Sequence, residues 1–233
     1  MKPEFDARMK RYEAVSEHFL PRRIPVIIRV DGRSFSRLTR ALYGREWSDV
    51  FALLMSKVAL HVMKDMQGCR FAYTQSDEIS FLLTDYTTIK SEPWFGYSIN
   101  KLVSISAGLA TSWFCDLGLH EGMSSLEGET FDSRAFSVPH DDVCNYFIWR
   151  QQDATRNAIQ KLAQSKFSHK HLQGKSRKDM QDMLWNEKGI NFNDLPVSQK
   201  RGSCVVDGLS DYNIPIFTTN RDYIERWVNV CTD

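Results

Sequence analysis

The sequence predicts an α+β fold built on an antiparallel sheet in βαββαβ order, with the helices on one face of the sheet. A β-branched run at 26–30 ends at Asp31-Gly32, which is typical of a buried strand followed by a tight turn. Two short apolar segments, 71–74 and 79–83, are four residues apart and indicate a hairpin. Helical periodicity on both sides of this hairpin gives the split βαβ pattern of ferredoxin-like folds.

Each element has its own signal. The segment 21–25, with a proline at each end, ends an N-terminal helical stretch. Ser48 is expected to cap a helix that runs to about Met66 along one apolar stripe, with Gly68 as its stop. The segment 75–78 is predicted to be a four-residue hairpin connection. Ser98 is expected to open a second helix to about Phe114, and 134–138 to form the fourth strand.

The rest of the chain reads as mainly helical. Helices are predicted at 143–167 and 176–185, the second opening with Ser176 and Asp179 at capping-box spacing and ending at Gly189. A strand pair within 202–217 and a helix at 223–230 close the chain. We therefore expect a catalytic domain at 1–140 and an extension at 141–233, packed as one continuous unit.

Composition limits the class of protein. With 233 residues, 42% of them hydrophobic and 25% charged, the chain has the profile of a soluble globular protein. It holds no uninterrupted apolar run of the roughly 18 residues that a membrane span needs, and residues 1–6 lack the apolar stretch of a signal peptide. A cytoplasmic protein without a membrane partner is expected. Its 5 cysteines are scattered without a Cys-x-x-Cys pair, which predicts reduced, mostly buried thiols.

The net charge of +1 hides two opposed blocks. Residues 156–178, called the basic segment below, hold seven Lys or Arg and no Asp or Glu, whereas 116–153 hold eight acidic residues and two arginines. The basic segment is a candidate surface for a nucleic-acid backbone, and a solvated helix face is the alternative.

Two carboxylates are predicted to meet at one edge of the sheet. Asp31 ends the first strand and Asp77 lies at the hairpin tip, and in a split βαβ sheet these strands are adjacent and central. With the Gly32 carbonyl they would form an oxygen-ligand site for Mg²⁺. Two such ions about 4 Å apart would activate an attacking hydroxyl and stabilise leaving pyrophosphate. Turn formation is the alternative role of both residues.

Phosphoryl transfer also needs cations. Lys101 lies in the first turn of the predicted 98–114 helix, where free N–H groups favour anions, and Ser76 and Arg29 flank the carboxylates. A solvated surface lysine is the alternative for Lys101. Residues 169–171 are interpreted as part of the basic face rather than a metal site, and 94–97 as an apolar contact under a loop. The chain has no P-loop motif.

Several motifs in one order resemble the tRNA-His guanylyltransferase family, including its Thg1-like proteins. They are Arg29-Val30-Asp31-Gly32-Arg33-Ser34-Phe35, the segment 73–81, Asn100-Lys101, the segment 131–134 and Trp149-Arg150-Gln151-Gln152-Asp153. Residues 172–174, 195–196 and 200–202 continue the order, so the resemblance spans about 4–206.

The resemblance implies a palm domain like that of polymerases and nucleotide cyclases, acting on tRNA 5′ ends. After activation with ATP, or on a triphosphate end, the 3′-hydroxyl of GTP or another nucleotide would attack, so that the chain grows in the 3′-to-5′ direction. It implies two Mg²⁺ ions on Asp31, Asp77 and the Gly32 carbonyl, with Glu78 as a supporting catalytic residue. The implied nucleotide contacts are Arg29, Gly32, Arg33, Ser34, Phe35, Ser76, Asn100 and Lys101.

The same resemblance implies residues for activation and tRNA contact. Arg150 and Asn157 match the segment that serves activation or 5′-end placement. The charge of the basic segment, independently of the resemblance, makes Lys170, Lys175 and Arg177 candidate tRNA contacts. A homotetramer is also implied.

Two positions depart from the eukaryotic members. Ser36 and the segment 155–157 stand where those members carry a histidine and a His-Ile-Asn-Asn segment. The chain is therefore more similar to bacterial or archaeal Thg1-like proteins, which repair truncated tRNA 5′ ends by templated addition. The open alternatives are a palm-type nucleotide cyclase and a non-catalytic RNA-binding module.

Overall fold

Within the residues described, 3–44, 46–123, 126 and 128–229, this computed structural model contains one six-stranded sheet. The strand order is β4-β1-β3-β2-β5-β6, and all neighbours are antiparallel. The strands are β1 (Val26–Gly32), β2 (Cys69–Gln75), β3 (Glu78–Leu83), β4 (Phe131–Ser137), β5 (Ser203–Val206) and β6 (Leu209–Asp211). The predicted α+β class and βαββαβ order are confirmed, and β5 and β6 extend the sheet beyond β2.

The helices begin and end close to their sequence signals. They are α1 (Pro3–Ala14), α2 (Phe35–Tyr43), α3 (Asp49–Asp65), α4 (Ile99–His120), α5 (His140–Lys166), α6 (His169–Leu172), α7 (Arg177–Lys188), α8 (Val197–Arg201) and α9 (Asp222–Val228), with 3-10 turns η1 (Trp94–Tyr97) and η2 (Phe192–Asp194). Ser48 accepts a hydrogen bond from the Phe51 amide at the start of α3, and Ser176 and Asp179 form the predicted capping box of α7. Helix α2 was not predicted, and α4 runs two turns beyond Phe114.

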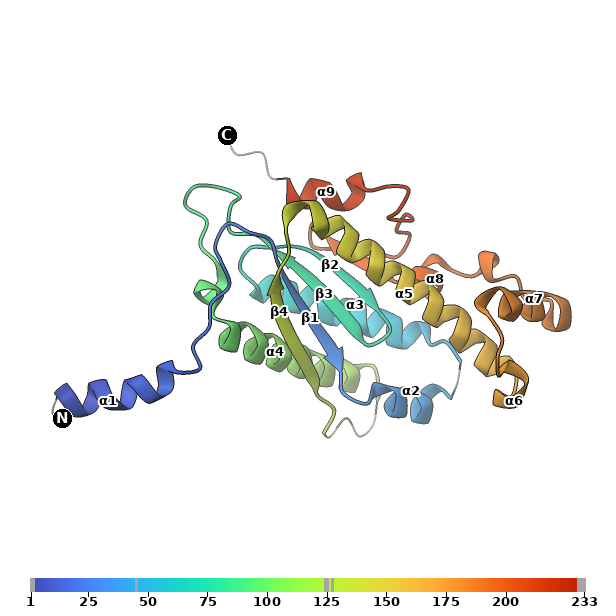
Figure 1. Cartoon of the computed structure of the whole chain (residues 1–233). Coiled ribbons are helices and arrows are strands. Elements are labelled where there is room, and N and C mark those ends of the chain that lie inside the picture. The colour runs from blue at the N-terminus through green and yellow to red at the C-terminus, as the bar shows by residue number, and fades with distance from the viewer. Residues whose placement is uncertain (1–2, 45, 124–125, 127, 230–233) are drawn as a thin grey trace.

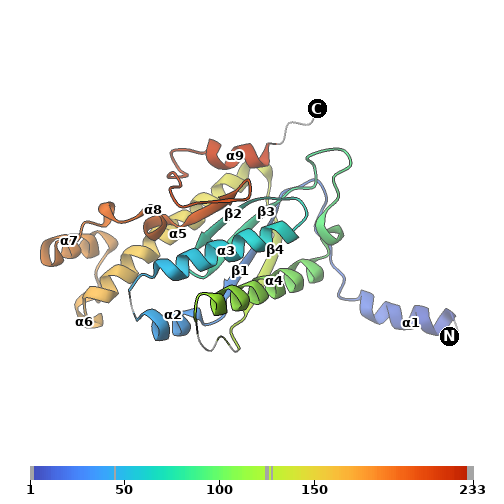
Figure 2. The same ribbon diagram turned by 180° about the vertical axis from the view of Figure 1, so that it is seen from behind.

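Helices cover both faces of the sheet (Figures 1 and 2). The helices of the βαββαβ unit lie on one face, as predicted, and helices of the C-terminal extension cover the other face, which was not predicted. Helices α3 and α4 pack on one face, where Val26, Ile28 and Val30 of β1 are buried. Helices α5 and α9 pack on the other, over Ile27. The central strands are apolar on both faces, and each face buries its apolar side chains only when helices cover it.

In the described part of the chain, α4 is the one helix that is long and apolar enough to cross a membrane. Its most apolar stretch of 18 residues has a mean hydropathy of 1.4. It packs against α3 and β4 and buries Leu102, Ala110 and Phe114. Length and composition are weak evidence for a span, because the core helix of a globular protein passes the same test.

Four cysteines fall in the described residues and all four are free thiols. Cys144 and Cys204 are buried, and Cys69 and Cys115 are half-buried; burial raises the pKa of the Cys69 thiol to about 12. Cys231 lies outside the described residues.

Candidate active site

The sheet face under α5 changes from apolar to acidic along its length. Successive side chains of a strand point to opposite faces, so Arg29 and Asp31 share the face of buried Ile27. Asp31 lies opposite Glu78 of β3 and Asp132 of β4. These three residues form a row at the end of the sheet, which we call the acidic row. An acidic row at a sheet end is the kind of surface that attracts cations.

Helix α5 mirrors this gradient. Its first half buries Val143 and Phe147 over the apolar part of the face. Its later turns carry Arg150, Asp153 and Asn157, which line a cavity together with Asp31. The polar half of α5 thus lies over Asp31 and Glu78, whereas Asp132 is exposed, and the site forms between the sheet and this helix.

A two-residue turn brings Asp77 to the acidic row. Gln75 and Glu78 are already paired across the hairpin, so the turn is Ser76-Asp77 and not the predicted four-residue connection. Ser76 has a φ of 51° in the left-handed region, which a two-residue hairpin turn requires. The Gly32 amide donates to the Asp77 carbonyl at 3.0 Å. Asp31 and Asp77 therefore lie beside each other at the ends of adjacent strands.

The electrostatics of this cluster favour a cation. Burial, followed by the charges of Asp77, Glu78 and Asp132, raises the pKa of Asp31 to about 6. Burial also raises the pKa of Asp77, against the opposing effects of hydrogen bonds from its own backbone and Ser76 and of the Lys161 charge. The pKa of each carboxyl group is raised because too little positive charge lies nearby to stabilise its ionised form. A bound divalent ion would supply the missing positive charge.

The donor set fits Mg²⁺ shared with a phosphate substrate. Asp31, Asp77 and the neighbouring Gly32 carbonyl offer only oxygen ligands, which this ion prefers. Phe35 packs so closely that a Cβ on Gly32 would lie 2.4 Å from its ring, so this chain path needs glycine. In the part of the chain that the structure describes, no three His, Cys, Asp or Glu residues form a metal-binding group. Water and phosphate oxygens would therefore complete the coordination.

Glu78 is tied to Arg150 instead of being free for a metal. Arg150 Nε donates to Glu78 Oε1 at 2.8 Å and Nη2 to Oε2 at 2.6 Å, and both residues are buried. Nη2 also donates to Asp153 at 3.1 Å, and Asn157 donates to the same Asp153 oxygen at 3.3 Å. The guanidinium lies over the Trp149 ring, 4.5 Å from its centroid. Arg150 thus links α5 to the sheet beside the two aspartates.

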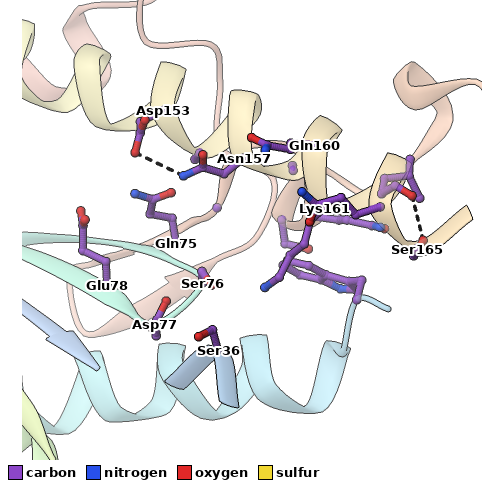
Figure 3. Close-up of a pocket in the computed structure, with 18 of the residues that line it drawn as sticks. Ser36, Gln75, Ser76, Asp77, Glu78, Asp153, Asn157, Gln160, Lys161 and Ser165 are labelled. Atoms are coloured by element: carbon purple, nitrogen blue, oxygen red, sulfur yellow. Dashed lines mark hydrogen bonds between the residues drawn. The ribbon is translucent and has the colours of Figure 1, made fainter. Parts of the chain in front are cut away.

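A cavity of about 670 Å³ opens between the hairpin tip, α2, the segment after it and α5. In Figure 3, Asp77 and Ser76 lie at the tip of the hairpin, Ser36 lies below them, and Asn157 and Lys161 extend from α5 above. Trp47, between α2 and α3, also lines the cavity. The space combines carboxylates, hydroxyls, a cation and an aromatic ring, which suits a nucleotide.

Some predicted nucleotide contacts lie close to this cavity. Arg33 and Ser34 are exposed in the turn that follows β1, and the Arg33 amide donates to the Thr130 carbonyl. Arg29 is half-buried, and its buried Nε has no hydrogen-bond partner among the residues that the structure describes. Phe35 differs from the prediction, because its ring is buried among Phe51, Phe114 and Phe131. Its side chain supports the turn from within the core.

Asn100 and Lys101 are not brought to the carboxylates. Strand β3 runs away from the acidic row, so the chain enters α4 at the opposite end of the sheet (Figure 1). There the Asn100 side chain donates to the Ser16 carbonyl, and Lys101 lies over the Phe95 ring. Only the second half of α4 reaches the site end, where Thr111 accepts from the Phe131 amide. The expectation that Lys101 lies near the carboxylates of its own chain is therefore wrong.

The basic segment begins in the wall of the cavity, where Lys161 and Lys166 lie, and continues beyond it. Lys170, Lys175 and Arg177 are exposed on α6, the following turn and the start of α7, and none of them lines the cavity.

The sequence argument did not assign Gln75, Trp47 or Lys161 to the site, although Gln75 lies in a family motif and Lys161 in the basic segment. Gln75 could have been found from its place opposite Glu78. Lys161 could have been found from its spacing, because it lies four and eight residues after Asn157 and Asp153 on one helix face. Trp47 lies in a loop without periodicity and offers no such signal.

Comparisons with known proteins agree on one family. The family model described as tRNAHis guanylyltransferase matches residues 6–139. The "tRNA(His) guanylyltransferase 2" of Arabidopsis thaliana is 31% identical over 77% of this chain, and the "Probable tRNA(His) guanylyltransferase" of Dictyostelium discoideum is 28% identical over 84%. The chain spans 35% of the length of the first relative and 78% of the second.

Solved structures match over nearly the whole chain. A bacterial tRNA(HIS) guanylyltransferase (Thg1)-like protein in complex with ATP superposes with a TM-score of 0.92 at 41% identity, covering 96% of this chain and 99% of that one. A second such bacterial protein, in complex with GTP, gives 0.82 at 36% identity, covering 97% and 99%. The Saccharomyces cerevisiae guanylyltransferase has the same fold at 22% identity, with a TM-score of 0.75 over 88% of this chain and 95% of that one. The sequence motifs, the fold and these matches together show that the chain belongs to the tRNA-His guanylyltransferase family.

Proposed function

We propose that this chain is a Mg²⁺-dependent nucleotidyltransferase that adds nucleotides to the 5′ end of tRNA in the 3′-to-5′ direction. One observation carries the proposal: Asp31 and Asp77 meet at a cavity of about 670 Å³ that also holds hydroxyls, a lysine and a tryptophan. Family membership supports the reaction type, and the complexes of the bacterial relatives with ATP and GTP support nucleoside triphosphates as substrates.

In this mechanism Asp31, Asp77 and the Gly32 carbonyl would hold two Mg²⁺ ions. When bound, the ions lower the pKa of the attacking 3′-hydroxyl and neutralise charge on the leaving pyrophosphate. Ser76 and Arg33, exposed on the two turns beside the carboxylates, contact the triphosphate. Arg150 acts by position: it fixes Glu78 and joins α5 to the sheet, which keeps the cavity walls in register.

We propose that the substrate is a truncated tRNA, whose 5′ end is activated by ATP or GTP and then repaired by templated addition. Ser36 lines the cavity where eukaryotic members have histidine, whereas the Thr155 hydroxyl donates to the Gln151 carbonyl within α5 and does not line the cavity. A short hydroxyl at Ser36 leaves more room than an imidazole. Guanylate addition to full-length tRNA-His is the other outcome of the assay below.

We further propose that tRNA binds along the exposed basic segment. We also propose that the protein forms a homotetramer and is located in the cytosol. Replacing Lys170, Lys175 and Arg177 with Glu should weaken tRNA binding and flatten its salt dependence, since each phosphate contact adds roughly 0.9 to the slope of log K against log salt. Filter binding at several salt concentrations measures that slope. An unchanged slope would remove the basic segment from the binding surface.

The test of the function is one nucleotide-addition assay. Purified protein is incubated with full-length and 5′-truncated tRNAs and each labelled triphosphate in turn, with Mg²⁺ or with EDTA. We expect label at the 5′ end of truncated tRNA, and a loss of at least about a thousandfold in Asp77→Asn. Asp182→Asn, an exposed position on α7, is the matched control.

Three results would contradict the proposal. Full turnover by Asp77→Asn would remove this carboxylate from catalysis. A cyclic nucleotide formed without tRNA would select a palm-type cyclase, and tRNA binding without any transfer would select an RNA-binding module.

A further inference from the structure

Among the residues that the structure describes, three basic side chains line the cavity, and two of them are paired with carboxylates. Arg150 is paired with Glu78 and Asp153. Lys166 Nζ lies 2.8 Å from Glu46 Oε1. Lys161 forms no ion pair with any residue that the structure describes. The cavity therefore presents one lysine whose charge is not taken up by a carboxylate of the described chain.

Helix geometry aims Lys161 at the reaction centre. Asp153, Asn157 and Lys161 are spaced by four residues and lie on one face of α5. Figure 3 shows Lys161 extending from α5 toward the side of the hairpin tip, where Ser76 and Asp77 lie. Asn157 donates a hydrogen bond to Asp153 at 3.3 Å, so these two side chains hold each other. Lys161 is therefore the charged group that reaches across the open part of the cavity.

We propose that Lys161 binds a phosphate group of the reacting polyphosphate, on the side of the cavity opposite Asp31 and Asp77. The inference deepens the proposed function and rests on it. A lysine ammonium is a compact charge with three donors, suited to a phosphate that presents oxygens in several directions. The position matches that use: phosphate oxygens held by cations on the two carboxylates would face the lysine from across the cavity. Either the triphosphate of the nucleotide or the 5′-phosphate of the tRNA could supply this group.

Two binding measurements separate these sources. The first compares the α,β-methylene analogue of GTP with guanosine, and the second compares tRNA carrying a 5′-monophosphate with tRNA carrying a 5′-hydroxyl. Lys161→Met should reduce affinity for one phosphorylated probe by about 10- to 100-fold, the range for a hydrogen bond to a charged group. Its affinity for the partner probe without the phosphate should not change. Lys161→Arg should recover most of the loss.

The side chain is exposed and makes no core contact, so Lys161→Met should unfold at the wild-type temperature. Lys64→Met, an exposed lysine at the end of α3, controls for the loss of one charge. If Lys161→Met loses affinity only for the GTP analogue, the phosphate bound by Lys161 belongs to the nucleotide. If it loses affinity only for 5′-phosphorylated tRNA, that phosphate belongs to the tRNA end. Unchanged affinity for both phosphorylated probes would overturn the role of Lys161. If that happens while Asp77→Asn still abolishes nucleotide addition, the proposed function stands and only this inference fails.

Discussion

Replacing Asp31 with Asn should make the metal-free protein more stable while removing a proposed metal ligand. The pKa of Asp31 is raised from 3.8 to about 6 by burial and by neighbouring negative charges. Because the folded pKa lies above the unfolded one, the ionised carboxylate opposes folding above about pH 6. Stability of the wild type should rise as the pH falls from about 6 toward 3.8.

The size of the effect follows from the same shift. A rise from 3.8 to about 6 corresponds to about 3 kcal/mol at neutral pH if it is taken in full. Asp31 is half-buried, so solvent screening reduces this to about 1 kcal/mol. For a chain of this size, 1 kcal/mol moves the melting temperature by about 2–4 °C. Asparagine has nearly the same shape, and no hydrogen bond of the Asp31 side chain is found among the described residues.

Thermal unfolding in EDTA at pH 7.5 and pH 5.0 tests this reasoning. The advantage of Asp31→Asn should be present at pH 7.5 and should shrink at pH 5.0, where wild-type Asp31 is largely protonated. Added Mg²⁺ should reverse the order at pH 7.5, since only the wild type keeps both carboxylates. An Asp31→Asn variant less stable than wild type in EDTA at pH 7.5 would refute the proposed cost of burying this charge beside other carboxylates.

Two further predictions concern the scaffold. Arg150→Met should destabilise the protein by about 3–5 kcal/mol, because it leaves Glu78 buried without its cation. Urea unfolding measures the loss of stability. If the effects of Arg150→Met and Glu78→Gln were additive in the double variant, the two side chains would not be coupled, contrary to this prediction. Gly108→Ala, with open space around its Cβ, should raise stability by up to about 1 kcal/mol. Gly202→Ala should lower it, because its φ is +82° and a Cβ would lie 2.2 Å from the Thr74 carbonyl oxygen. Equal melting temperatures for the two glycine variants would contradict this packing argument.

The core of the fold could be predicted because its signals are local. The 26–30 run, the 71–83 hairpin and the Ser48 and Ser176 caps each lie within one stretch of chain. The second covered face was missed although its signal was present: a strand that is apolar at every position from 26 to 28 cannot leave one side to solvent. Helix α2 was missed because it begins directly after the turn that carries the Asp-Gly motif, at Ser34 with a φ of 62° and no side-chain cap bond.

For the site, prediction depended on strand direction. Asp31 and Asp77 were expected to converge because β1 and β3 are adjacent and antiparallel, which places the end of one beside the start of the other. The same rule should have excluded Lys101, since the chain leaving β3 must enter α4 at the opposite end of the sheet. Arg150 is a different case. Its motif indicates a functional residue, but only the fold shows that its charge is used by Glu78 and Asp153 rather than left for a substrate.

The position of α5 decides how the catalytic unit should be delimited. The family model ends at residue 139, yet Arg150, Asn157 and Lys161 line the cavity from beyond it. The helix also buries the second face of the sheet through Val143 and Phe147, so without it Ile27 would be exposed beside the acidic row. Arg150, which holds Glu78, is therefore on the same helix as Asn157 and Lys161, which line the cavity about two and three turns further on. A boundary near residue 140 divides the sequence motifs into two groups, but the cavity is built from residues on both sides of that boundary.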